Sequence, residues 1–96
     1  MEDRIRGGWN QFTIDQRKYL IQEFTKFFNR ICGSPLYEND NFVFWSGNSI
    51  GAYLEKTSDI YPHYVNAEIK VENLFEVSKI RKSIDEIVSN TRKLDI

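Results

Sequence analysis

The chain of 96 residues holds little of what several specialised protein classes require. It has one cysteine, one histidine and two prolines, and its formal net charge is -1. A single cysteine cannot form a disulfide within the chain, and a lone thiol is typical of a reducing compartment, so we expect a cytoplasmic protein. A single histidine without neighbouring cysteines cannot assemble a metal site unaided. The sequence therefore predicts no disulfide framework, no metal and no cofactor.

Two further absences concern membranes and nucleic acids. No apolar run approaches the roughly 20 residues of a transmembrane helix, and residues 1–8 are charged rather than apolar. The near balance of 13 basic and 14 acidic residues creates no overall field that would attract nucleic acid. Residues 31–72 contain only Lys56 and Lys70 as basic residues beside six carboxylates, so this segment would repel phosphates. We expect no membrane partner and do not favour a nucleic-acid partner.

The remaining composition is that of a globular protein. Hydrophobic residues make up 41% and charged residues 28% of the chain. A chain of this length buries roughly 60–65% of its unfolded surface, which allows one core. We therefore expect a single domain over residues 1–96, with residues 1–10 as a loosely ordered N-terminal arm. Gly7 and Gly8 raise the entropic cost of ordering that arm.

Two amphipathic helices are predicted. The first begins after a capping box formed by Thr13 and Gln16 and ends before Gly33, so it spans about residues 14–32. The second begins after Asn73, which forms a similar box with Glu76, and runs to about residue 92. Apolar residues recur at helical spacing in both segments: Leu20, Phe24, Phe27, Phe28 and Ile31 in the first, and Val77, Ile80, Ile84, Ile87 and Val88 in the second.

A β-hairpin is predicted in the middle of the chain. Residues 42–45, with the sequence Phe-Val-Phe-Trp, are a dense run of β-forming residues. Gly47 and Asn48 follow as a two-residue turn, because both tolerate a positive φ. This turn predicts a register in which Trp45 faces Ile50 across the two strands.

A third strand completes the predicted fold. Residues 65–72 alternate strictly between apolar and polar, which indicates a half-buried strand with one wet face. The order helix-strand-strand-strand-helix predicts an α+β two-layer sandwich, with a three-stranded antiparallel sheet and two amphipathic helices. This order is similar to that of the double-stranded RNA-binding domain. That family has a basic motif at the start of its last helix, which residues 73–77 lack, so we do not carry its function over.

The hairpin divides its side chains between the two faces of the sheet. Trp45 shares one face with Val43, Ile50, Ala52 and Leu54, because side chains alternate along a strand. The other face holds three rings and two charged residues of the third strand. Aromatic residues rimmed by charge are typical of protein interfaces, although a helix or the arm with Trp9 would hide them equally well. We predict a binding surface on this second face: Phe42, Phe44, Tyr53, Glu68 and Lys70.

This surface favours a small protein-binding or inhibitor module. Such a protein would dock on a macromolecular partner, either a larger target or its own copy in a homodimer. Aromatic residues make up 15% of the chain, and no assembled catalytic group is evident, so no catalytic residue is assigned. Immunity proteins, antitoxins and anti-defence inhibitors of phages share this general character.

Two enzyme alternatives remain open. Residues 47–51 match the Gly-x-Ser-x-Gly elbow and resemble the nucleophile motif of ester hydrolases, which implies a triad of Ser49, Asp59 and His63. Residues 44–47 resemble the Phe-Trp segment of the ADP-ribosyl cyclase and NAD glycohydrolase group. That resemblance implies a substrate-stacking Trp45 and a catalytic Glu68, and it requires Trp45 to point away from the core.

Two more features favour a structural interpretation. Cys32 lies at the end of the first helix, where the helix dipole opposes thiolate formation, so a buried inert thiol is expected. Lys79 and Lys82 on the second helix form a weak basic edge. Because Asp85 and Glu86 interrupt it, a solvated helix face with local ion pairs is favoured over a phosphate site.

Overall fold

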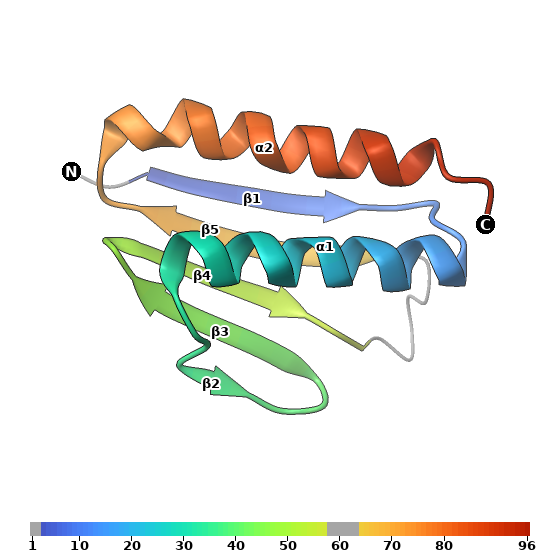
Figure 1. Cartoon of the computed structure of the whole chain (residues 1–96), viewed down its shortest axis with the longest axis horizontal. Coiled ribbons are helices and arrows are strands. Elements are labelled where there is room, and N and C mark those ends of the chain that lie inside the picture. The colour runs from blue at the N-terminus through green and yellow to red at the C-terminus, as the bar shows by residue number, and fades with distance from the viewer. Residues whose placement is uncertain (1–2, 58–63) are drawn as a thin grey trace.

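The computed structural model describes residues 3–57 and 64–96 as two helices and one sheet (Figure 1). The helices coincide with the predicted ones, and the capping box of Thr13 and Gln16 is present at the start of the first. The elements follow in the order β1 (Asp3–Trp9), α1 (Ile14–Cys32), β2 (Tyr37–Glu38), β3 (Phe42–Gly47), β4 (Ile50–Glu55), β5 (Val65–Val71) and α2 (Leu74–Arg92).

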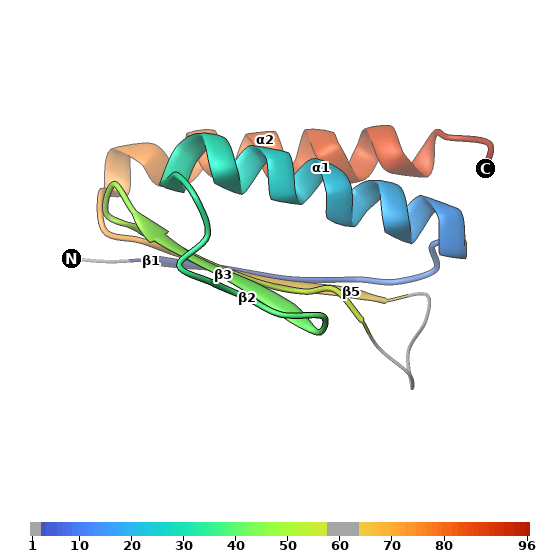
Figure 2. The same cartoon turned by 60° about the horizontal axis from the view of Figure 1, so that its bottom comes forward.

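The sheet is antiparallel, and its strands lie in the order β1-β5-β4-β3-β2. Both helices cover the same face of this sheet, which gives two layers (Figure 2). The α+β prediction is therefore confirmed, and β3, β4 and β5 are the three predicted strands. The prediction of a three-stranded sheet is wrong, because the described residues form five strands.

The first additional strand, β1, lies where the sequence predicted a loose arm. Ile5 of β1 pairs with Ile69 of β5 and is only 4% exposed. A Cβ atom on Gly7 would collide with the ring of Trp9, and one on Gly8 would collide with the hydroxyl of Tyr64. These glycines therefore let aromatic rings lie against the strand, which offsets the entropy that ordering them costs.

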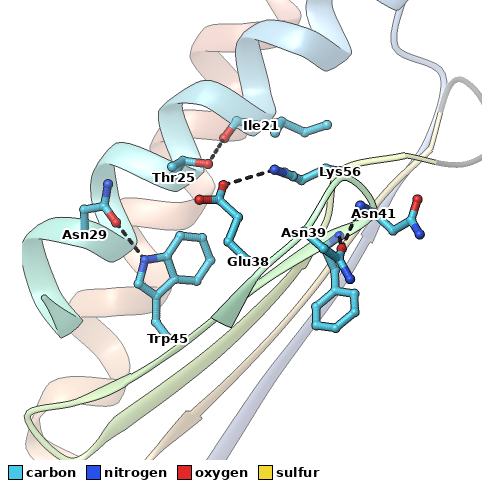
Figure 3. Close-up of polar contacts among 9 residues, drawn as sticks. Ile21, Thr25, Asn29, Glu38, Asn39, Asn41, Trp45 and Lys56 are labelled. Carbon is cyan, nitrogen blue, oxygen red and sulfur yellow. Dashed lines mark hydrogen bonds and ion pairs between the residues drawn. The ribbon is translucent and has the colours of Figure 1, made fainter. Parts of the chain in front are cut away.

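The second additional strand, β2, is held by the turn that joins it to β3. The side-chain oxygen of Asn39 accepts hydrogen bonds from the backbone N–H groups of Asn41 (2.8 Å) and Phe42 (2.9 Å) (Figure 3). Lys56 also contacts the carboxylate of Glu38 at 3.0 Å. The sequence predicted a loop around Asn39, and its turn-forming side chain is what brings the short β2 back onto β3.

The hairpin between β3 and β4 has a different register from the predicted one. Its turn residues are Asn48 (φ 56°) and Ser49 (φ 61°), and Trp45 faces Ala52 rather than Ile50. Gly47 is the last residue of β3, and only glycine fits there, because a Cβ atom would collide with the carbonyl oxygen of Cys32. Moving the turn by one residue shifts the pairing by two, so every side chain keeps its predicted face.

Trp45 is the centre of the contact between helix α1 and the sheet. Its side chain is 0% exposed, and its ring centroid lies 5.0 Å from that of Phe28. The indole Nε1–H donates a hydrogen bond of 2.7 Å to the side-chain oxygen of Asn29 on α1 (Figure 3). The predicted inward orientation of Trp45 is therefore confirmed, and its polar atom is satisfied within the layer interface.

We expect the hydrogen bond between Asn29 and Trp45 to be measurable in a double-mutant cycle. Asn29→Ala removes the acceptor of a buried donor and should lower the free energy of unfolding by about 1–3 kcal/mol. Once Trp45→Phe has removed the donor, the same change should cost roughly 1 kcal/mol less. Urea denaturation measures all four proteins, with Asn90→Ala on the exposed side of α2 as the control. Strict additivity of the two changes would show that this bond contributes nothing.

Candidate functional site

The sheet face opposite the helices carries a group of aromatic rings. In the part of the chain that the structure describes, no helix covers this face (Figure 2). Because Val43 and Trp45 are buried under α1, the alternate residues Phe42 and Phe44 lie on the opposite side. We call the rings on this side the aromatic face: Tyr37, Phe42, Phe44 and Tyr53.

The rings of the aromatic face lie in contact with one another. The centroids of Tyr37 and Phe42 are 5.5 Å apart, and those of Phe42 and Tyr53 are 5.3 Å apart. Phe44 stands between Tyr37 and Tyr53 in the register of three neighbouring strands. Tyr37 is 56% exposed, while the other three rings are half-buried. These rings form a continuous apolar surface that the described chain leaves partly open to solvent.

Tyr37 is a member of the aromatic face that the sequence did not predict. It belongs to β2, which has only two residues and therefore no alternation that a pattern search could find. The only available signal was the Asn-Asp-Asn turn that follows at residues 39–41, combined with a tyrosine two residues before it.

Charged residues border the aromatic face on β5. Glu68 lies directly opposite Tyr53, and Lys70 lies opposite Gly51. Glu55 follows Tyr53 on the same face of β4. Burial, and secondarily the negative charge of Glu55, raises the pKa of Tyr53 above its ordinary value. The phenol therefore stays neutral at physiological pH, when its hydroxyl can donate and accept hydrogen bonds.

A hollow of about 250 Å³ lies at the turn end of the aromatic face. Phe44, Gly51 and Lys70 are among its lining residues. A Cβ atom on Gly51 would have no neighbour closer than 3.8 Å, so the missing side chain leaves free space between the strands on either side. This geometry suits the insertion of one side chain from a partner.

The serine of the hydrolase alternative does not lie in an elbow. Ser49 is in the hairpin turn, and the next element is the strand β4 rather than a helix. An elbow presents its serine between a strand and a helix. The other two members of the expected triad, Asp59 and His63, lie outside the described residues.

The two residues of the NAD alternative lie on opposite faces of the sheet. Trp45 is buried beneath α1, whereas Glu68 is on the side of the aromatic face. They cannot line one pocket without reversing the side-chain alternation of a strand. Across residues 3–57 and 64–96, no group of three His, Cys, Asp or Glu side chains is placed to hold a metal ion. No helix there is both long and apolar enough to cross a membrane.

Comparison of the chain with protein-family models, curated proteins and solved structures gives no match.

Cys32 is buried at the end of α1, as predicted. Burial raises the pKa of its thiol to about 11. Because the thiolate is the reactive form, this cysteine is a poor nucleophile at neutral pH.

The titration of the Cys32 thiol should be visible in how the free energy of unfolding depends on pH. The folded state holds the proton up to about pH 11, whereas an ordinary cysteine titrates near 9.0. The stabilising contribution of this proton is complete below pH 9 and is lost as the pH rises from about 9 to about 11. Over this range we expect the wild type to lose roughly 1–2 kcal/mol more unfolding free energy than Cys32→Ala. Urea titrations at both ends of the range test this, and parallel losses in the two proteins would contradict it.

Proposed function

We propose that this protein is a small binding module that docks on a folded protein partner through the aromatic face. The observation that carries the proposal is the contiguous group of rings on the sheet face that no described helix covers. Tyrosine supplies a large contact area and a polar end, and it is enriched in the cores of protein interfaces. The hollow beside Phe44 offers a place for one anchoring side chain of the partner.

The charges around the aromatic face favour protein over nucleic acid. Stacked aromatic residues on a sheet can also hold unpaired bases, and such surfaces carry a basic groove for the phosphates. Here Glu55, Glu68 and Glu72 lie on or beside the aromatic face, with Lys70 among them. A phosphate backbone crossing these carboxylates would be repelled, whereas a mixed protein surface would be tolerated.

Docking without turnover is how inhibitor proteins act. Immunity proteins, antitoxins and phage anti-defence proteins block a partner by occupying its surface, and we propose the same mode for this chain. The enzyme alternatives gain no support, because Ser49 lies in a turn and because the sheet separates Trp45 from Glu68.

Substitution of the aromatic face should abolish docking without unfolding the domain. Phe44→Ser with Tyr53→Ser removes two half-buried rings from the face opposite the core, and Phe75→Ser is the matched control. Phe75 is 93% exposed on α2, away from the aromatic face. A photo-crosslinking residue in place of the exposed Tyr37 should capture a protein partner, and the double variant should lose at least 90% of that product. A tenfold loss of binding corresponds to about 1.4 kcal/mol of binding free energy.

Three results would contradict this function. One is equal crosslinking by the double variant and the wild type. Another is binding of single-stranded RNA that weakens steeply with salt. The third is turnover of NAD or of an activated ester that Glu68→Gln or Ser49→Ala abolishes. Crosslinking to a second copy, together with a doubled mass in light scattering, would identify the partner as the protein itself.

A further inference from the structure

The outer edge of β1 is a second surface, separate from the aromatic face. β1 pairs with β5 on one side, and no described strand pairs with its other side. Such an edge presents a row of unpaired backbone N–H and C=O groups. The strand has seven residues, contains no proline and includes Gly7 and Gly8. It therefore lacks the proline that would block the pairing of a further strand.

Helix α2 lies over this edge of the sheet. α2 packs on both β1 and β5, and Figure 1 shows that it runs in the same direction as β1. Ile80 and Glu76 line a hollow together with Ile31 of α1, so that side of α2 faces α1. The opposite flank of the helix borders an open groove of about 710 Å³. Its described lining belongs entirely to α2 and includes Leu74, Val77, Arg81, Lys82, Asp85 and Glu86.

We propose that an extended peptide segment of a partner binds here as an additional strand. It pairs antiparallel with β1 and lies beneath α2, so that alternate side chains enter the groove. Strand addition takes its affinity from backbone hydrogen bonds and its specificity from pockets for every second side chain. This surface goes beyond the proposed docking through the aromatic face and does not depend on it.

A second copy of the chain fits this edge poorly. Paired strands lie about 4.8 Å apart, whereas packed helices need about 8–10 Å between their axes. Because α2 packs on β1, pairing two β1 strands would bring two copies of α2 closer together than packed helices allow. A peptide carries no such helix, so the helix that excludes a second copy does not exclude a single added strand.

The charged residues of α2 determine which order of charged and apolar residues the added peptide strand should have. Arg81 and Lys82 form a basic pair, and Asp85 and Glu86 form an acidic pair four residues later. Four helical residues rise about 6 Å, which is close to the roughly 7 Å spanned by two strand residues. An antiparallel strand meets the acidic pair first, then the basic pair, and then the apolar Val77, which lies one further turn toward the start of α2. The occupant therefore reads basic-x-acidic-x-apolar from its N-terminus.

Binding of a designed peptide tests the proposal. The probe is the acetylated peptide Thr-Lys-Thr-Glu-Thr-Leu-Thr, and the control peptide exchanges its Lys and Glu. We expect the probe to slow hydrogen exchange of alternate β1 amides and to bind at least tenfold more tightly than the control. N-methylation of the probe amides that face β1 should abolish binding, because it removes the donors of the new ladder.

A charge-reversed protein separates this surface from a general charge effect. A variant with Arg81→Glu, Lys82→Glu, Asp85→Lys and Glu86→Lys should prefer the control peptide by a similar factor. Phe44→Ser with Tyr53→Ser should bind the probe as the wild type does, which distinguishes this edge from the aromatic face. Unprotected β1 amides, equal affinity for both peptides, or a dimer that protects β1 would each overturn the proposal.

Discussion

The burial of Trp45 under α1 is the constraint on which the arrangement of this sheet depends. The indole N–H of Trp45 donates a hydrogen bond to Asn29, and the ring packs against Phe28. Both the polar atom and the apolar ring therefore have partners in the layer interface. Because side chains alternate along a strand, the inward Trp45 obliges Phe44 to lie outward. The same alternation continues across the ladder to Tyr53 and Tyr37. The aromatic face is therefore a direct consequence of how the core is anchored.

Covering only one face of an antiparallel sheet leaves two kinds of surface. The face that no described helix covers carries the rings, and the outer edge of β1, which no described strand pairs, lies beside α2. An antiparallel sheet tolerates one solvated face, because its hairpins require no crossover helix on that side. The two surfaces differ in chemistry, since one offers apolar area and the other offers backbone groups in strand register.

Three glycines lie where two of the differences between the expected and the observed sheet occur, at β1 and at the β3–β4 hairpin. Gly47 lies in β3 against the carbonyl of Cys32, where a side chain would not fit, and the hairpin turn is formed by Asn48 and Ser49. Gly7 and Gly8 lie against Trp9 and Tyr64, which lets β1 join the sheet instead of remaining an arm. A glycine in a sequence indicates conformational freedom or close approach, and only the neighbouring atoms show which of the two applies.

Local sequence patterns were sufficient to predict the two helices, the strand β5 and the face on which each hairpin side chain lies. Capping residues and a 3.6-residue period act within one segment, and alternation survives an error of two residues in register. Local patterns were insufficient to predict β1, β2 and the pairing across the hairpin, because these features depend on contacts with residues far away in the chain. Ile5 is buried because β1 pairs with β5 and packs under α2, and Tyr37 joins the rings after Asn39 has turned the chain. Local chemistry thus decided which segments are helices and strands, and long-range contact decided how many strands pair and which surfaces remain open.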